Sequence, residues 1–308
     1  MILREFPNLQ WLKAQAQNGF ADRKTMQGTP LPHPGWPTVI LNTETKRCYR
    51  DNIRGPLSIF ANLRGISAVE TGPKRVVVHP DFYYVTNHDQ QYSLEVSNPR
   101  GTEVCNVHFG EYWLDQVLAT LVKRPGQLID EGYFQAPLER FELHNCLHSK
   151  DPAFGLLLTK AKSAAHALEE EETLYELLVL LIKNDQDVRK AFQNLASSKP
   201  STRQEISRRL IAAVDYIHSH YDKDLTLAEL AAISCLSRFH FLRLFKDAFG
   251  KTPHQFINEV KIQRAIAALR NSSQDIRSIS RSLGFRDSST FGRLFRRTVG
   301  VYPSRFRN

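Results

Sequence analysis

Two arginines, Arg243 and Arg293, lie fifty residues apart in nearly the same local sequence, Phe-x-Arg-Leu-Phe followed by Lys or Arg. A guanidinium group can donate two parallel hydrogen bonds to O6 and N7 of guanine, the commonest specific contact between a protein and a DNA base. The pair therefore indicates a surface that reads nucleic-acid bases at two places. A solvated surface charge is the alternative for any single arginine, and the repetition argues against it for these two.

The residues around each arginine would complete this surface. In both copies the Phe and Leu positions fall on one face of a helix, which leaves the opposite face for contacts. Phe239 or Leu242 could meet a thymine methyl group, and basic residues of the second copy could hold phosphates. The predicted DNA-binding residues are Arg238, Phe239, His240, Leu242, Arg243 and Lys246 in the first copy, and Ser288, Ser289, Thr290, Arg293, Arg296 and Arg297 in the second.

The elements that must position these residues are also repeated, because Gly250, Pro253 and Phe256 recur fifty positions later. Such a match predicts two copies of one supersecondary unit. Each copy has the pattern of a short helix, a tight turn and a second helix. Thr226 and Glu229 have the spacing of a capping box at the first helix start. Ser237 and Asp287 can cap the two reading helices.

Between the copies, Thr252-Pro253 opens a connecting helix that we expect to reach about Arg270. At 1.5 Å per residue this helix would be roughly 27 Å long. Successive major-groove segments on one face of B-DNA recur about every 34 Å. The two reading helices could therefore enter adjacent segments of the groove. A further helix, from Glu205 to about Tyr221, would complete the first core.

These segments resemble the AraC/XylS family of transcription regulators. The similarity covers about residues 204–307 and rests on Leu-Thr-Leu-Ala-Glu-Leu-Ala, Ser-Arg-Phe-His-Phe-Leu-Arg-Leu-Phe-Lys and the closing Gly-Val-Tyr-Pro-Ser-Arg-Phe-Arg. The resemblance implies a bipartite site on double-stranded DNA, a usual role as transcription activator, and RNA polymerase as a partner. It also implies base contacts at Phe239, Leu242 and Arg243. Leu242 departs from the family pattern, because a polar side chain would be expected at a position that contacts bases.

The charge distribution agrees with a polyanion partner for this region alone. Residues 201–308 hold 19 Lys and Arg against 9 Asp and Glu, a net charge of +10, whereas residues 1–200 sum to −1. A basic domain joined to a nearly neutral one is typical of nucleic-acid binding by the basic part.

The first part of the chain has a different pattern. Short strand-like runs at residues 76–78, 82–85, 92–96 and 104–109 are separated by turn residues at 72–73, 79–81, 87–89 and 98–101. The segment is similar to the cupin-like sensor of many AraC-type regulators, chiefly at residues 80–88. We therefore predict an α+β chain: a cupin-like β-barrel sensor at 1–160, a helical dimerisation segment and linker at 161–200, and a DNA-binding domain with two helix-turn-helix units at 201–308.

A small-molecule effector is expected in the barrel mouth. Its predicted contacts are Tyr84, His88, Tyr92, His108 and Trp113. His79, His88 and His108 could instead converge on a metal, but the region lacks the His-x-His pattern of metal-dependent cupins. We accordingly predict no metal, no cofactor and no catalytic residues.

The segment between the domains has two possible uses. Leu174, Leu177, Leu178, Leu181 and Ile182 form one helical stripe within residues 168–195. The stripe either covers the barrel or pairs with a second subunit, and the resemblance favours a homodimer. Residues 197–202 have the composition of a linker.

The remaining features point to a reduced, cytoplasmic location. The longest apolar run, residues 177–182, is far short of a membrane span. Cys48, Cys105, Cys146 and Cys235 are scattered and form no Cys-x-x-Cys pair, so we expect free thiols, with redox sensing by one of them as the alternative. The competing function is a DNA-tethered enzyme with a catalytic N-terminal barrel. The absence of a Pro-Cys-His-Arg motif argues against the repair methyltransferases that carry similar helical units.

Overall fold

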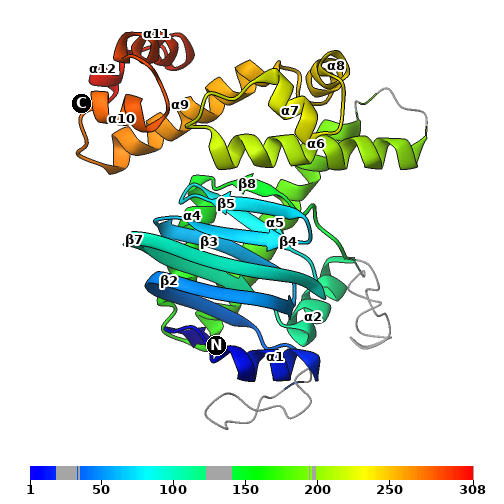
Figure 1. Cartoon of the computed structure of the whole chain (residues 1–308). Helices are drawn as coiled ribbons and strands as arrows, with labels where there is room; N and C mark the ends of the chain where they lie inside the picture. The colour runs from blue at the N-terminus through cyan, green and yellow to red at the C-terminus, as the bar shows by residue number, and fades with distance from the viewer. Residues whose placement is uncertain (19–32, 34, 123–140, 194, 196–198, 308) are drawn as a thin grey trace. The chain divides into compact units, whose positions relative to one another are not determined.

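The structure, a computed structural model, describes residues 1–18, 33, 35–122, 141–193, 195 and 199–307. The chain divides into two compact units, Met1–Asp187 and Val188–Asn308. The first unit is built on a β-sheet with helices, and the second unit is entirely helical in its described part (Figure 1). This agrees with the predicted combination of an N-terminal β-rich part and a C-terminal helical part.

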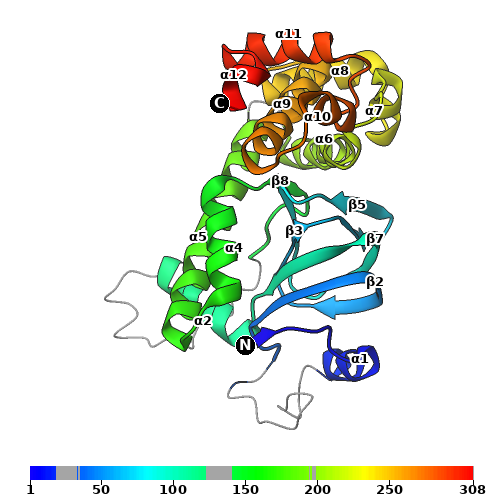
Figure 2. The same cartoon turned by 90° about the vertical axis from the view of Figure 1, so that its left-hand side faces the viewer.

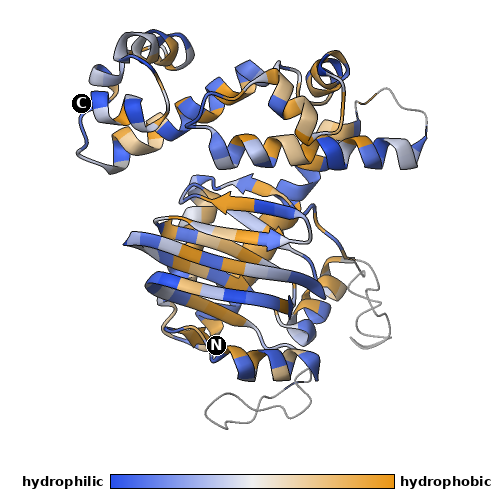
Figure 3. Cartoon of the chain, in the orientation of Figure 1, coloured by the Kyte–Doolittle hydropathy of each residue, from blue (hydrophilic) through white to orange (hydrophobic). Residues whose placement is uncertain are grey.

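Within the described residues, the N-terminal unit contains one eight-stranded sheet. Its strands pair in the order β1-β2-β7-β3-β6-β8, and β4 branches from this path by pairing with both β7 and β5. Both apolar and polar residues occur along the strands (Figure 3), and β6 is buried at every position, so side chains on both faces of that strand are covered. The strands are β1 (Ile2–Leu3), β2 (Val39–Gly55), β3 (Ser58–Arg64), β4 (Ser67–Thr71), β5 (Lys74–Val78), β6 (Phe82–Thr86), β7 (Gln90–His108) and β8 (Leu147–Ser149).

Strand β7 departs from the sequence prediction. It continues from Gln90 to His108, where two strands separated by a turn were expected. The register with β2 breaks between Thr45 and Arg47, so residues 98–101 bulge out of the ladder without ending the strand. The Asn98 amide donates to the carbonyl oxygen of Gly101 at 2.8 Å, which closes this bulge. The turn residues therefore mark a bulge, and the prediction of two separate strands is wrong here.

The described strands do not close into a barrel. The ordered path ends at β1 on one side and at β8 on the other. On the side away from β2, the two halves of β7 pair with different strands. Leu94 and Glu95 pair with β4, whereas Val104 and Val107 pair with β3. The sheet consequently branches instead of closing, and the predicted closed cupin-like barrel is not confirmed.

Helices cover one face of this sheet. Helices α4 (Pro152–Ser163) and α5 (Ala167–Gln193) lie side by side along it (Figure 2). The predicted stripe of α5 is buried at Leu174, Leu177, Leu178 and Leu181, in one cluster with residues from the strands. The stripe therefore covers the sheet, which was one of its two predicted uses. Helix α2 (Glu111–Val122) contributes Leu114 and Leu118 to the same core, and α1 (Leu9–Gln17) lies against β2.

The C-terminal unit contains the helices that the sequence pattern predicted, with one extension and one addition. Helix α6 begins at Pro200 with Lys199 as its N-cap, so residues 200–202 are helical although they were expected in the linker. Residues 197 and 198 lie outside the described part. The helices are α6 (Pro200–His220), α7 (Leu227–Ile233), α8 (Arg238–Phe249), α9 (Pro253–Asn271), α10 (Ile276–Ser282), α11 (Ser288–Val299) and the additional α12 (Pro303–Arg307).

Two separate apolar clusters stabilise this helical unit. The first contains Phe241 and Phe245 of α8, and the second contains Phe291 and Phe295 of α11. Helix α9 contributes to both, since Ile257 packs in the first cluster while Ile262, Ala265 and Leu269 pack in the second. Figure 1 shows α9 running between the α7–α8 pair and the α10–α11 pair. None of the helices in the described ranges is long and apolar enough to cross a membrane.

Candidate nucleic-acid interface

The first candidate reading helix, α8, has a defined start and end. The Ser237 hydroxyl accepts a hydrogen bond from the His240 amide at its N-terminus. Gly250 ends the helix with a φ of +69°, a left-handed conformation that costs glycine little. The predicted inward residues Phe241, Leu244 and Phe245 are buried. The opposite face is therefore held toward solvent at a fixed rotation.

That face carries the predicted residues of the first copy. Arg238, Phe239, His240, Arg243 and Lys246 are exposed, and Leu242 is half-buried. Phe239 is 85% exposed, so its ring is free to contact a partner. A thymine methyl group would offer this ring an apolar contact.

The second candidate reading helix, α11, repeats the arrangement. Asp287 caps it by accepting from the Thr290 amide at 2.7 Å, and Gly300 ends it with a φ of +91°. These interactions with Thr290 lower the pKa of Asp287, because they stabilise its ionised form. All six predicted residues of this copy are exposed: Ser288, Ser289, Thr290, Arg293, Arg296 and Arg297.

The basic residues of the two helices differ in their present contacts. Among the residues that the structure describes, Arg238, Arg243, Lys246 and Arg297 form no ion pair with a carboxylate. Arg296 donates to the Tyr302 hydroxyl at 3.1 Å and stacks over its ring, so this side chain is held by its own domain. The free charges are the better candidates for contacts with DNA.

The turns that precede the two helices have similar geometry but different lengths. Cys235 in the first turn has a φ of +51° and Gly284 in the second has a φ of +73°. One residue separates Cys235 from the cap Ser237, whereas two residues separate Gly284 from the cap Asp287. The second turn is therefore one residue longer, a difference that comparison of the reading helices alone does not reveal.

Contacts from the end of α6 hold the second copy against the first. Tyr221 packs in the second cluster, and the Arg264 guanidinium stacks 4.8 Å from the centre of its ring. Asp224 forms an ion pair with Arg286 at 3.0 Å. A Cβ on Gly284 would overlap the backbone of Asp222, so the second turn lies directly against this loop. The two reading helices are thereby parts of one packed unit.

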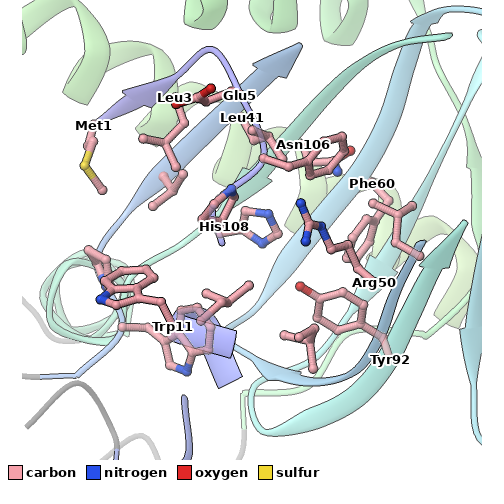
Figure 4. Close-up of a pocket in the computed structure, with 18 residues that line it drawn as sticks. Met1, Leu3, Glu5, Trp11, Leu41, Arg50, Phe60, Tyr92, Asn106 and His108 are labelled. Atoms are coloured by element: carbon pink, nitrogen blue, oxygen red, sulfur yellow. The ribbon is translucent and has the colours of Figure 1, made fainter. Parts of the chain in front are cut away.

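The predicted effector contacts do not form one site. Tyr92 and His108 line a cavity between the N-terminal residues and the sheet (Figure 4). Tyr84 is buried elsewhere, with its hydroxyl bonded to Thr71 and to Asn145. His88 is exposed near Glu111, and Trp113 stacks on Phe109 in the core. Sequence reasoning missed Arg50 and Asn106, which face the cavity from β2 and β7.

The three histidines considered as metal ligands lie in three different environments. His79 lies in the turn before β6, His88 is exposed and His108 lines the cavity. Burial lowers the pKa of His108 to about 4, which keeps its imidazole neutral. In the described ranges, no group of three His, Cys, Asp or Glu residues is placed to hold a metal ion.

Comparisons with known proteins address the helical unit. Residues 230–308 match the family described as helix-turn-helix domain. The MmsAB operon regulatory protein of Pseudomonas aeruginosa is 37% identical over 92 residues, which is 30% of each chain. The HTH-type transcriptional activator RhaS of Klebsiella pneumoniae is 27% identical over 143 residues, 46% of this chain and 47% of that protein. The chain therefore spans less than half the length of these two relatives.

Among solved structures, the DNA-binding domain of AdpA in complex with a target DNA is 26% identical, with a TM-score of 0.31. The match covers 32% of this chain and 89% of that one. The two capped helix pairs and the sequence matches together define a helix-turn-helix domain in the C-terminal part of the chain. This domain is similar to the DNA-binding domains of AraC-type regulators, as the sequence predicted.

Proposed function

We propose that this protein is a transcription regulator that binds two adjacent major-groove segments of double-stranded DNA and responds to a small molecule. Helix α8 reads one segment, chiefly through Arg243, and α11 reads the other through Arg293. The observation that carries the proposal is the duplication itself: two capped helices expose an arginine at the same position, each opposite a buried Phe-x-x-x-Phe pair.

The packing of the helical unit supports simultaneous binding by both helices. Helix α9 has 19 residues, about 28 Å at 1.5 Å per residue. It joins the two apolar clusters, and the backbone of Asp222 lies directly against the second turn at Gly284. Two readers with a fixed separation require two half-sites with a fixed separation, about one helical turn of DNA.

The rest of the assignment follows the predicted division of the chain. Residues 1–160 sense the effector, residues 161–200 connect and support dimerisation, and residues 201–308 bind DNA. We place the protein in the cytoplasm as an activator that contacts RNA polymerase. Because the leucine stripe of α5 is buried against the sheet, a homodimer through residues 161–200 would have to use the other face of α5, where Tyr175 and Val179 are exposed. Sedimentation of the whole protein with and without DNA tests this point.

Selection of bound sequences from a random DNA pool by the whole protein tests the proposed function. We expect two short motifs about one helical turn apart, and an affinity that falls steeply as salt rises. An insertion of five base pairs between the motifs should abolish the gain from the second one, because it turns that segment to the opposite face of the duplex. Binding without enrichment of any sequence would contradict the proposal.

A further inference from the structure

A cavity in the N-terminal unit has walls suited to one class of ligand. The space between its walls is about 1000 Å³ when the part open to solvent at its mouth is counted. Residues of the N-terminal segment, of α1 and of strands β2, β3 and β7 line it, and most of them are apolar. The apolar lining includes the rings of Phe6, Trp11, Trp36 and Phe60.

Two buried N–H groups in this wall, the Asn106 amide and Arg50 Nε, have no acceptor among the described residues. Asn106 is only 2% exposed, and its Oδ1 accepts a hydrogen bond from the backbone amide of Ala61 at 3.2 Å. A backbone amide can only donate, so this contact fixes the side-chain orientation and leaves the NH₂ group without a partner among the described residues. A buried donor left unsatisfied destabilises the protein, and a ligand acceptor would remove this penalty.

Arg50 is the second donor. Its Nε is buried and bonds to no described residue, while its guanidinium lies 5.2 Å from the ring centre of Phe6. Within the described ranges no carboxylate pairs with Arg50; the other charged residue of the lining, Glu5, is exposed. An arginine turned toward an apolar space without a counter-ion is a site for an anion.

Tyr92 and His108 complete the polar end. In Figure 4 the Arg50 guanidinium, the His108 imidazole and the Tyr92 hydroxyl all point toward the centre of the cavity. Burial raises the pKa of Tyr92, so its hydroxyl remains a donor. The Ser58 hydroxyl donates to the carbonyl of Pro56, so His108 must donate from Nδ1 to the Ser58 oxygen. This tautomer leaves Nε2 of His108 as an acceptor. The polar end of the cavity thus offers this one imidazole acceptor beside the N–H groups of Arg50 and Asn106 and the Tyr92 hydroxyl.

We propose that the cavity binds a monocarboxylic acid with an apolar body, its carboxylate held by Arg50 and Asn106. The proposal deepens the effector part of the proposed function and rests on it for the biological role. A single guanidinium matches a single negative charge, whereas a phosphate with two charges would leave one uncompensated. A sugar would bury several hydroxyl groups against walls that offer few polar partners.

Calorimetric titration of the whole protein with matched acids and amides tests the head group. Hexanoate and hexanamide have the same chain and nearly the same shape, and phenylacetate and phenylacetamide form an aromatic pair. We expect at least one acid to bind at one site per chain, with an affinity about tenfold or more above that of its amide, because charge-assisted hydrogen bonds are worth about 1.5–3 kcal/mol. Equal binding of acid and amide in both pairs, or binding of neither acid, would overturn the proposal.

Substitution then locates the carboxylate. Arg50→Gln should abolish the preference for the acid, while Arg47→Gln, an equal loss of charge at an exposed position of the same strand, should preserve it. An unchanged preference in Arg50→Gln would also overturn the proposal. Should this variant not fold, Asn106→Leu, which removes the second donor, takes its place. The titrations contain no DNA, so failure of sequence selection with intact acid binding would overturn the regulator and leave the ligand site standing.

Discussion

Replacing Arg243 with alanine separates base reading from simple charge attraction. Arg243 is exposed and forms no ion pair within the described residues, so its loss should change the free energy of unfolding by less than about 0.5 kcal/mol. A bidentate contact with guanine is worth about 1–3 kcal/mol of discrimination. The variant should therefore bind the selected DNA site about 5-fold to 150-fold more weakly.

Fluorescence anisotropy measures this effect on two duplexes, the selected site and a scrambled sequence, across a series of salt concentrations. Arg243→Ala should lose most of its affinity on the selected site and relax the preference at one base pair. Arg297→Ala removes the same charge from α11, where we predict a phosphate contact. It should weaken both duplexes alike and reduce the slope of affinity against salt by about one unit.

Arg293→Ala should behave like Arg243→Ala, but at a base pair in the other half-site. Equal losses on specific and scrambled DNA for Arg243→Ala would refute the assignment of this arginine as a base reader. The protein would then hold DNA through its charge alone on that helix.

Three further substitutions or conditions test the packing. Gly284→Ala should lower the melting temperature strongly, because the added Cβ would overlap the backbone of Asp222. Gly250→Ala is the control: its Cβ meets nothing within 4 Å, so the only cost is the strain of a left-handed backbone conformation, about 1–2 kcal/mol. Thr226→Ala removes the capping box that Thr226 forms with Glu229 and should cost about 1 kcal/mol in chemical denaturation; Ser273→Ala, an exposed change outside any cap, should cost almost nothing. Burial lowers the pKa of both His108 and His148 to about 4, so the unfolded chain binds their protons first, and the free energy of unfolding should fall as pH drops from about 6.5 to 4. His148→Gln should flatten this decline, and an unchanged slope would contradict the burial argument.

The helical unit could be predicted from sequence because its signals are local. The caps Thr226, Ser237, Thr252 and Asp287 all accept the hydrogen bonds that their spacing implied. Caps and apolar periodicity act within a few residues, so neighbouring sequence determines them. The role of Arg296 was not accessible in this way, because its partner Tyr302 belongs to the following loop.

The sheet and the cavity depend on pairings between distant strands. Residues 98–101 have the composition of a turn, yet they bulge from a continuous strand because β2 and β3 pair with the residues on either side. Arg50 and Asn106 are 56 positions apart, and both line the cavity because β2 pairs with β7. Aromatic residues and histidines attracted attention as ligand contacts, while an arginine in a strand and a buried amide carried no local signal.

The position of α9 between two cores has a consequence for how the helical unit unfolds. Neither cluster is complete without this helix, which supplies Ile257 to one and Ile262, Ala265 and Leu269 to the other. Each half alone buries few large side chains and would be marginal as an independent domain. Opening of either half exposes one end of α9, so the two halves should lose their structure cooperatively. The slowest amide hydrogen exchange in the unit is then expected in the middle of α9, the segment on which both apolar clusters depend.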